Sequence, residues 1–418
     1  MNPFSSELLR QLAQTHGTPL WVYDAATIRA RIAALRSFDT IRFAQKANSN
    51  LQLLKLMRAE GVQVDAVSLG EIERALAAGY SARGAGPSGI VFTADVIDRA
   101  TLAKVVAEDI PVNAGSVDML HQLGAATQGK STGHRVWLRI NPGFGHGHSN
   151  KTNTGGEHSK HGIWHADLPA ALAAVRQHGL RLVGLHMHIG SGVDYQHLET
   201  VCDAMVDLAA RVDLPIEAIS AGGGLSIPYR NGEAPIDTAH YHALWQAARR
   251  RIEAARGHAL QLEIEPGRYL VAEAGVLLAE VRATKTMGSR FFALVDAGFN
   301  ELMRPAMYGA HHGISVIAAD DAPRPLADTV VAGPLCESGD VFTQGDGGVV
   351  LSRPLPRAQI GDLLVFHDAG AYGASMSSNY NRRPLTAEVL VDAGQARLIR
   401  RRQTIGELLA LETGLAGG

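Results

Sequence analysis

The sequence is poor in cysteine and has no surplus of charge of either sign. Its 418 residues include two cysteines, Cys202 and Cys336, and 39 Lys and Arg against 41 Asp and Glu. Two cysteines in so long a chain do not suggest a disulfide framework and are typical of a protein in a reducing compartment. Because no basic surplus is present to neutralise a phosphate backbone, we expect no nucleic-acid partner.

Long apolar runs and an apolar leader are also missing. No uninterrupted apolar stretch approaches the roughly 18 residues that span a bilayer, and residues 1–10 lack the basic start and apolar run of a signal peptide. We therefore expect a cytoplasmic protein without a membrane segment. Hydrophobic residues still make up 46% of the chain, which predicts a large core, and the length suits two domains.

The middle of the chain alternates short apolar runs with amphipathic helical segments. Apolar strands between helices predict a parallel sheet that is covered on both faces. Eight such units predict a (β/α)8 barrel, an α/β fold with a TIM-like closed sheet. The runs lie at 41–44, 62–68, 90–95, 111–116, 135–142, 182–191, 218–224 and 260–267.

Beyond about residue 275 the helical rhythm gives way to strand-like runs separated by Gly, Pro and Asp. These runs predict a second, mostly antiparallel β domain. We assign residues 26–276 to the barrel and residues 1–25 together with 277–418 to the β domain. A loop rich in Gly and His, 143–161, exceeds the usual length of a connection, and we expect it to cover the active site.

Reactive side chains gather at the predicted carboxyl ends of the barrel strands, where barrel enzymes place their active sites. Lys46 follows the first strand, Gly222–Gly224 follow the seventh and Glu265 follows the eighth. Burial would make Lys46 a nucleophilic amine, although a lone lysine more often reaches the surface. The glycine amides suit the close approach of an anion, although three glycines equally suit a tight turn. For Glu265 the plainer interpretation is an ion pair with Arg268 on the rim.

The sixth predicted strand ends in His186-Met187-His188, which leaves a second class of enzyme open. Residues two apart on a strand point the same way, so His186 and His188 could share a divalent metal, as in a metal-dependent hydrolase. The other strand ends offer no convincing further ligands, and we expect no metal. The whole set instead suits a cofactor with an aldehyde, a flat ring, a ring nitrogen and a phosphate, as in pyridoxal 5′-phosphate.

The sequence resembles the fold-type III pyridoxal-phosphate-dependent decarboxylases, and within them the diaminopimelate decarboxylase family, over essentially the whole chain. The segment FAQKA, the loop GFGHGHSNKTNTGGE and the short C-terminal tail resemble those of its enterobacterial-type branch. The resemblance implies a homodimer that converts meso-2,6-diaminopimelate to L-lysine and carbon dioxide, the last step of lysine biosynthesis. The motifs that carry it are FAQKANSN, VSLGEIERALAAGY, GLHMHIGSG, SAGGGLS, EIEPGR, VDAGFNELMRPAMYGAHH, GPLCESGDVF and GAYGASMSSNYNRRP.

The resemblance also implies a role for each matching residue. Lys46 would bond to the cofactor aldehyde, His188 would stack on its ring, and Glu265 would pair with the ring nitrogen. Cys336 and Glu337 would reach the site from the partner subunit, with Cys336 near the reacting carbon. The implied cofactor-binding residues are Lys46, His188, Ser191, Gly222, Gly223, Gly224, Glu265, Gly267, Arg268 and Tyr372. The implied substrate-binding residues are Arg268, Arg304, Tyr308, Glu337 and Tyr372, and the implied catalytic residues are Lys46, His188 and Cys336.

Two other functions stay open at this point. A relative could decarboxylate another amino acid, such as a D-amino acid, ornithine, lysine or arginine, but Arg304 within MRPAMYG argues against it. A binding protein that has lost the chemistry is a second alternative, and the joint presence of Lys46, Glu265 and Cys336 argues against that.

Plainer structural roles also exist for individual residues. Without the family resemblance, Cys336 would be a buried small hydrophobic residue and Arg304 would pair with Glu301 on the surface. Family members more often have YAVKAN where this chain has FAQKAN, so Gln45 is expected to alter the surroundings of Lys46 without changing the reaction.

Overall fold

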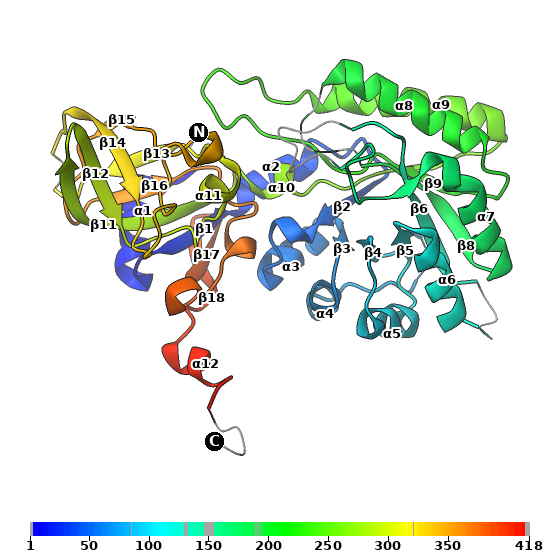
Figure 1. The fold of residues 1–418 in the computed structure, drawn as a ribbon, viewed down its shortest axis with the longest axis horizontal. Helices are drawn as coiled ribbons and strands as arrows, with labels where there is room; N and C mark the ends of the chain where they lie inside the picture. The colour runs from blue at the N-terminus through cyan, green and yellow to red at the C-terminus, as the bar shows by residue number, and fades with distance from the viewer. Residues whose placement is uncertain are drawn as a thin grey trace. The chain divides into compact units, whose positions relative to one another are not determined.

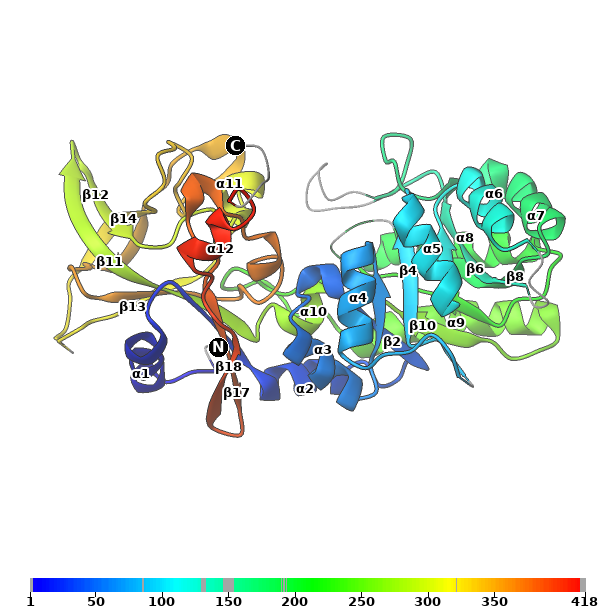
Figure 2. The same ribbon diagram turned by 90° about the horizontal axis from the view of Figure 1, so that it is seen from below.

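The computed structural model describes residues 3–84, 86–128, 133–145, 154–188, 190, 192, 194–320 and 322–413. The chain divides into two compact units. Met1–Ala30, Ile227–Ala234 and Leu270–Gly418 form one, here called the β unit, and Arg31–Ser226 with Pro235–Tyr269 form the other, here called the barrel unit. Figures 1 and 2 show the elements of each unit.

The barrel unit contains a closed parallel sheet, which confirms the predicted fold. Neighbouring strands pair in parallel in the order β5-β4-β3-β2-β10-β9-β8-β6, and pairing of β5 with β6 closes the ring. A two-residue strand, β7 (Ile163–Trp164), adds to β6. The eight strands of the ring are β2 (Thr40–Ala44), β3 (Gln63–Ala66), β4 (Ile90–Ala94), β5 (Val112–Ala114), β6 (Arg135–Asn141), β8 (Arg181–His186), β9 (Ala218–Ser220) and β10 (Gln261–Ile264).

Helices follow the barrel strands along the chain and cover the outer face of the sheet (Figure 2). Several start at a side-chain cap, as where Ser68 accepts from the Glu71 N–H at 3.2 Å. The side chain of Glu71 accepts from the Val67 N–H and not from that of Ser68, so only half of a capping box is formed. The helices are α3 (Leu51–Ala59), α4 (Leu69–Ala77), α5 (Arg99–Glu108), α6 (Val117–Ala126), α7 (Leu168–Gln177), α8 (Tyr195–Ala210) and α9 (Thr238–Arg256).

The β unit is built on a second sheet with the strand order β15-β14-β12-β11-β1-β17-β18. Strand β16 pairs with β11 and with β13, and only β1–β17 and β12–β14 are parallel. The mostly antiparallel domain is therefore confirmed. Its strands are β1 (Leu20–Asp24), β11 (Gly275–Met287), β12 (Arg290–Val295), β13 (Ile314–Ile317), β14 (Leu326–Ala332), β15 (Arg353–Pro356), β16 (Leu363–Phe366), β17 (Ala387–Asp392) and β18 (Gln395–Arg400).

Helix α1 (Ser6–His16) covers part of this sheet and closes its core. Leu9 and Leu12 of α1 pack in one buried cluster with Val22, Leu278 and other strand residues. The remaining helices are α2 (Ala25–Ala33), α10 (Arg268–Val271), α11 (Arg304–Tyr308) and α12 (Ile405–Leu409). Segment 227–234, which the sequence placed in the barrel, groups with the β unit because Tyr229 packs there.

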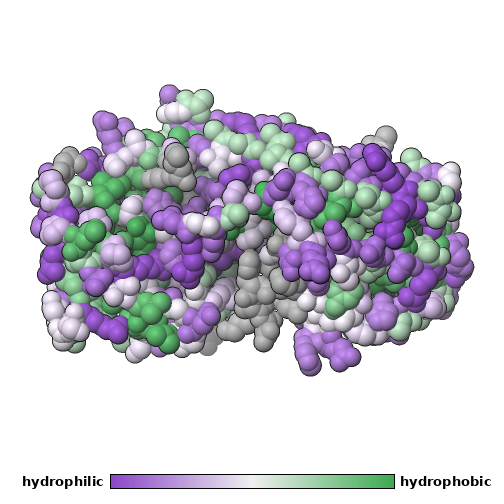
Figure 3. All heavy atoms as spheres, turned by 90° about the horizontal axis from the view of Figure 1, so that it is seen from above, coloured by the Kyte–Doolittle hydropathy of each residue, from purple (hydrophilic) through white to green (hydrophobic). Residues whose placement is uncertain are grey.

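Hydrophilic residues are interspersed with hydrophobic ones on the face shown in Figure 3. Within the described part of the chain, no helix has both the length and the apolar character required to cross a bilayer.

Candidate active site

Lys46 lies on a short 3₁₀ turn, Gln45–Ala47, which begins directly where β2 ends. Gln45 and Ala47 are buried, but the side chain of Lys46 is exposed. Of the two interpretations offered for Lys46, the structure favours the plainer one, a lysine whose side chain is exposed. Gln45 turns inward and donates from Nε2 to the Glu71 carbonyl at 3.2 Å, away from Lys46.

The charge of Lys46 acts on two carboxyl groups, those of the buried Asp65 and the half-buried Glu71. Burial raises the pKa of Asp65 well above its ordinary value, the charge of Glu265 adds to this, and Lys46 acts in the opposite direction. Burial also raises the pKa of Glu71, again against the effect of Lys46. The lysine therefore lies near two carboxyl groups that both have raised pKa values.

Glu265 forms a buried hydrogen bond with His186. His186 Nε2 lies 2.6 Å from Glu265 Oε2, and the two side chains are 1% and 9% exposed. Burial by itself would raise the pKa of Glu265, but His186, Arg42 and Arg139 lower it below its ordinary value. The carboxylate is therefore ionised, and the expected rim pair with Arg268 is replaced by a bond inside the barrel.

The same hydrogen bond occupies His186, the first histidine of the His186-Met187-His188 motif. His186 Nε2 donates to Glu265, whereas His188 Nδ1 accepts from the Gly223 N–H at 3.1 Å. The two rings thus have separate partners instead of a shared ion. Among the residues that the structure describes, no three His, Cys, Asp or Glu side chains are arranged to hold a metal.

The three glycines after β9 are required for close packing of the backbone. An added Cβ at Gly222, Gly223 or Gly224 would lie 2.1, 2.5 or 2.4 Å from the carbonyl oxygens of Met187, Glu265 and Gly190, respectively. Two of the three amides are used inside the protein, because Gly222 donates to Ser220 Oγ and Gly223 donates to His188. The tight-turn interpretation therefore accounts for these two, while the Gly224 N–H has no partner among the described residues.

His188 is electrically neutral in this position. Burial lowers its pKa well below the ordinary value, and Arg139 and Lys46 lower it further. Acceptance of the Gly223 N–H by Nδ1 places the ring proton on Nε2. Ser191, also predicted for the site, lies outside the described residues.

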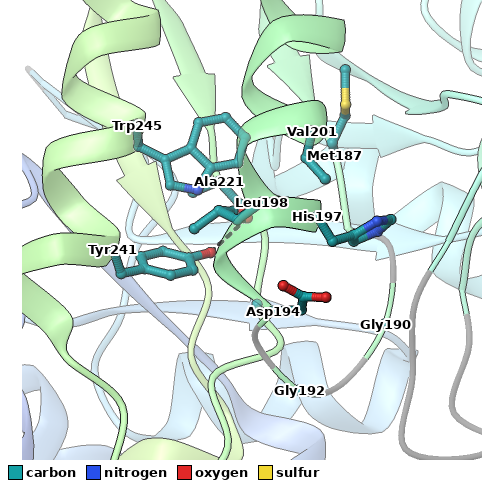
Figure 4. Close-up of a pocket in the computed structure, with 11 residues that line it drawn as sticks. Met187, Gly190, Gly192, Asp194, His197, Leu198, Val201, Ala221, Tyr241 and Trp245 are labelled. Atoms are coloured by element: carbon teal, nitrogen blue, oxygen red, sulfur yellow. Dashed lines mark hydrogen bonds between the residues drawn. The ribbon is translucent and has the colours of Figure 1, made fainter.

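A small pocket lies against the glycine turn, at the start of α8 (Figure 4). Its inner wall is apolar, and its polar side chains include Asp194 and His197. In Figure 4 the Tyr241 hydroxyl donates to the Ala221 carbonyl, at 3.5 Å. Lys46 and Glu265 do not line this pocket, so it lies behind the glycine turn and not at the reactive groups. The apolar wall consists of Met187, Leu198, Val201, Tyr241 and Trp245.

Gly267 holds the lysine turn and the glutamate strand together. A Cβ at Gly267 would lie 3.2 Å from the Ala44 carbonyl oxygen and 3.3 Å from the Cβ of Ala47. The Ala44 N–H also donates to the Pro266 carbonyl at 3.2 Å. Lys46 and Glu265 are thus carried by two backbone segments in direct contact, and Arg268 follows as the first residue of α10.

Arg139, on β6, is a buried residue of this site that the sequence argument missed. It is 7% exposed, and its guanidinium forms no hydrogen bond or ion pair within the described residues. It lies opposite His186 in the pairing of β6 with β8, and its charge lowers the pKa of both Glu265 and His188. The available signal was its position two residues before Asn141, on the same side of the strand.

The described ends of the Gly- and His-rich loop are tied to the barrel. Asn141 donates from Nδ2 to the carbonyls of Gly156 and His161, at 3.1 and 3.2 Å. The ring of His161 pairs with Asp95, and Thr154 donates to the His188 carbonyl at 2.8 Å. Residues 146–153 of the loop lie outside the described residues, so its expected role as a cover stays a prediction.

In the β unit, Arg304 is buried and bound to a histidine. Its Nη1 donates to His312 Nε2 at 2.8 Å, and its guanidinium carbon lies 4.9 Å from the centre of the Tyr229 ring. The pairing with Glu301 proposed as a plainer alternative is wrong. Glu301 is itself buried and accepts from the Gly298 N–H at 2.7 Å, and burial raises its pKa to about 7. Tyr308 is half-buried at the end of α11.

Cys336 lies on an exposed, well-anchored loop of the β unit. Its side chain is exposed and its N–H donates to Asn381 Oδ1 at 2.9 Å, so the buried hydrophobic role is wrong. Glu337 lies 3.5 Å from the Tyr380 hydroxyl. Cys202 is buried, and both cysteines are free, as their number in the sequence suggested.

Tyr372 has a strained backbone. Its φ is +57°, a conformation that bulky side chains adopt rarely. The following Gly373 cannot be replaced easily, because a Cβ there would lie 2.4 Å from the Trp21 ring. Strain of this kind persists where the surroundings impose it, and it is common at functional sites.

Comparisons with known proteins agree with this chemistry. Residues 25–272 match the family model for the pyridoxal-dependent decarboxylase, pyridoxal binding domain. A diaminopimelate decarboxylase of Escherichia coli is 65% identical over 98% of this chain and 97% of its own length. One of Streptomyces coelicolor is 66% identical over 97% of this chain and 91% of its own length.

Solved structures give the same result. A crystal structure of diaminopimelate decarboxylase has a TM-score of 0.94 at 65% identity, and covers 98% of this chain and 96% of that one. The Helicobacter pylori diaminopimelate decarboxylase complexed with L-lysine has a TM-score of 0.87 at 30% identity, and covers 97% and 99%.

Proposed function

Because the chain belongs to the diaminopimelate decarboxylase family of pyridoxal-dependent decarboxylases, we propose which of its residues carry out the conversion of meso-2,6-diaminopimelate to L-lysine and carbon dioxide. The chain is a carboxy-lyase of lysine biosynthesis. One observation carries the assignment of roles. Glu265 is ionised and bonded to His186, and the backbone that follows it, at Gly267, lies against the turn that carries Lys46. A decarboxylase of another amino acid is not favoured at 65–66% identity to these relatives.

We assign pyridoxal 5′-phosphate as the cofactor, because the residues present fit its groups. Glu265 Oε2 is taken by His186, but Oε1 accepts no hydrogen bond within the described residues and suits a protonated ring nitrogen. The Gly224 N–H and the Arg139 guanidinium suit anionic oxygens. When bound, the cofactor supplies the electron sink that takes up the pair left by the departing carboxylate.

Lys46 and His188 prepare the site for this chemistry. The exposed amine of Lys46 can bond to an aldehyde without a rearrangement of the fold, and Asp65 and Glu71 beside it can take up or return protons. His188, a neutral ring fixed by Gly223, can stack on a flat ring without adding a charge. Glu265, kept ionised by His186, holds a proton on the cofactor nitrogen.

A further set of residues is assigned to the distal end of the substrate. We assign the distal carboxylate to Arg304 with Arg268, Tyr308 and Tyr372, and the distal ammonium to Glu337. A ligand without that carboxylate loses a charged contact in a desolvated site, at a cost of roughly 2–5 kcal/mol. Ornithine, which carries its only carboxylate at the reacting end, is therefore expected to be a poor substrate.

We further propose that two copies of the chain share their sites as a homodimer. Cys336 and Glu337 are exposed on an anchored loop, which supports their insertion into the site of a second protomer. There the Cys336 thiol or the Lys46 amine would return a proton to the substrate carbon. An exposed free thiol also supports a cytoplasmic location, where thiols stay reduced.

The direct test is carbon dioxide release from meso-2,6-diaminopimelate with and without added pyridoxal 5′-phosphate, for the wild type and Lys46→Ala. We expect release that depends on both. Lys55→Ala, an exposed lysine on α3, is the matched control and should keep full activity. A wild type that binds the cofactor yet releases no carbon dioxide would contradict the substrate, and one that never binds it would contradict the whole assignment.

The loop 143–161 is proposed to cover the site, because its described end donates a hydrogen bond to the His188 carbonyl. Deletion of residues 149–157 should raise KM or lower kcat. Unchanged kinetics would contradict the proposal.

A further inference from the structure

His312 contacts Arg304 directly, although nothing in the proposed function requires it. Arg304 Nη1 donates to His312 Nε2 at 2.8 Å, and the two residues are 6% and 2% exposed. We propose that His312 is a positioning residue that orients Arg304 toward the distal carboxylate of the substrate. This proposal rests on the substrate contact assigned to Arg304 above.

The two hydrogen bonds of His312 fix the position of its proton. A guanidinium can only donate, so Nε2 must be the acceptor and carries no hydrogen. Nδ1 lies 2.9 Å from the carbonyl oxygen of His367, which can only accept, so Nδ1 carries the proton. The ring is therefore neutral and both nitrogens are in use. A second proton on the ring would place a cation against Arg304.

Neighbouring groups hold the imidazole in place. The ring of Tyr229 meets it edge to face, with 5.6 Å between ring centres and an angle of 78°. Arg353 Nη1 donates to the carbonyl oxygen of His312 at 2.5 Å. The segment itself is anchored, because the His367 N–H donates to the Gly313 carbonyl at 2.8 Å. His312 is thus fixed by its ring, by its backbone carbonyl and by the anchored residue that follows it.

This arrangement determines the plane of the guanidinium. His312 accepts one of the N–H groups of Arg304, and Tyr229 covers one of its faces. These two contacts hold the planar guanidinium in one orientation. In that orientation it can make a bidentate contact with a carboxylate. Without the acceptor on His312, Arg304 keeps its charge but loses this orientation, so binding of a carboxylate should weaken.

Two ligands isolate the contribution of the carboxylate. L-lysine, which a relative binds in its crystal structure, keeps the distal carboxylate of the substrate. 1,5-Diaminopentane has the same carbon chain and the same two amino groups but lacks that carboxylate. Each is titrated into the full-length, cofactor-loaded protein, and binding is followed through the absorbance of the cofactor. The kinetic constants for meso-2,6-diaminopimelate are measured beside these titrations.

Two matched variants distinguish the roles of the two ring nitrogens of His312. In His312→Gln an amide oxygen can take the place of Nε2, whereas in His312→Asn the amide reaches only the place of Nδ1. We expect His312→Asn to weaken the binding of L-lysine about tenfold or more and to change the binding of 1,5-diaminopentane less than about twofold. The same variant should raise KM for meso-2,6-diaminopimelate more than it lowers kcat. His312→Gln should restore L-lysine binding to within about threefold of the wild type.

Tyr229→Leu is the second variant, used if His312→Asn does not fold, and Tyr229→Phe is its control. Tyr229→Leu, which removes the ring, should weaken the binding of L-lysine more than that of 1,5-diaminopentane. Tyr229→Phe, which keeps the ring, should not. Equal effects on both ligands, or on neither, would overturn the positioning role. If Arg304→Lys also fails to discriminate between the ligands, the error lies in the assigned substrate contact. If the wild type does not decarboxylate meso-2,6-diaminopimelate, the error lies in the proposed function itself.

Discussion

His186 donates a hydrogen bond of 2.6 Å to the carboxylate of Glu265, and both side chains are buried within the barrel unit. Nδ1 of the same ring has no hydrogen-bond partner among the described residues. His186 therefore bonds to Glu265 through Nε2 alone. It keeps one carboxylate oxygen occupied and directs the other toward the bound cofactor.

Replacement of His186 should therefore impair the role of Glu265 more than the fold. In His186→Phe the main group that opposes the effect of burial is lost, so the pKa of Glu265 should rise. A carboxyl with a raised pKa is protonated over more of the acidic range, so the acidic limb of the kcat–pH profile should move to higher pH. We expect kcat near neutral pH to fall about a hundredfold. An unmoved acidic limb would contradict this role.

His186→Gln is the matched control, because a side-chain amide can still donate to Glu265. Its kcat should stay within about tenfold of the wild type, with a smaller movement of the acidic limb. Cofactor binding, followed by absorbance, should persist in both variants. Loss of the cofactor from both would instead indicate a structural role for His186.

Gly223→Ala should both destabilise the protein and weaken cofactor binding. The new Cβ would lie 2.5 Å from the Glu265 carbonyl oxygen, so the backbone that carries Glu265 must move. We expect a loss of about 2–4 kcal/mol in the free energy of unfolding. Gly406→Ala in α12 is the control, because its Cβ would meet only Thr404 Oγ1 at 3.9 Å. Denaturant unfolding of both variants gives the comparison, and equal stabilities would contradict the packing argument.

Glu301 should make the stability of the protein depend on pH. Burial raises its folded-state pKa from 4.5 to about 7, so the folded state binds the proton more tightly than the unfolded state. The stabilisation is fully present below pH 4.5 and is lost as the pH rises through about 7. Between these limits the free energy of unfolding should fall by roughly 2–3 kcal/mol in the wild type.

Glu301→Gln should flatten that part of the stability profile. The orphaned Oδ1 of Asn300 can then accept from the new amide. Denaturant unfolding at pH 5 and pH 8 compares the two proteins, with Glu7→Gln on the exposed side of α1 as the control. The same pH dependence in wild type and Glu301→Gln would show that the titrating group is elsewhere.

The two thiols should differ strongly in reactivity. Cys336 is exposed, whereas Cys202 is buried and its pKa is raised to about 12, chiefly by burial. Only a thiolate reacts readily with an alkylating reagent, so native protein treated with iodoacetamide at pH 7.5 should gain one adduct, at Cys336. Peptide mass analysis locates the adduct, and Cys336→Ala should gain none. An adduct at Cys202 before Cys336 would contradict the described burial.

Sequence periodicity predicted the fold well because each strand is short, apolar and followed by a helix. All eight barrel strands occur where the apolar runs predicted them, whereas β13 and β15 of the β unit have only a weak signal in the sequence. Both are short, and β15 contains two prolines, so neither shows the alternation that marks a strand.

The contacts of the site were harder to predict, because they join residues that are distant in sequence. Glu265 and His186 are 79 positions apart, and nothing local indicates their hydrogen bond. The sequence left open whether Lys46 is buried or exposed, and only the structure shows that it is exposed on the turn that begins at Gln45. His312 lies within a recognised motif, but its partner is known only from the coordinates.

Strand β1 has a consequence for the order in which the chain folds. It pairs with β11 on one side and with β17, which ends at Asp392, on the other. The centre of this sheet is therefore incomplete until β17 has left the ribosome. The barrel strands all lie between Thr40 and Ile264, so that part can fold during synthesis. The long separation of β1 from β17 makes completion of the β unit the late and slow step of folding.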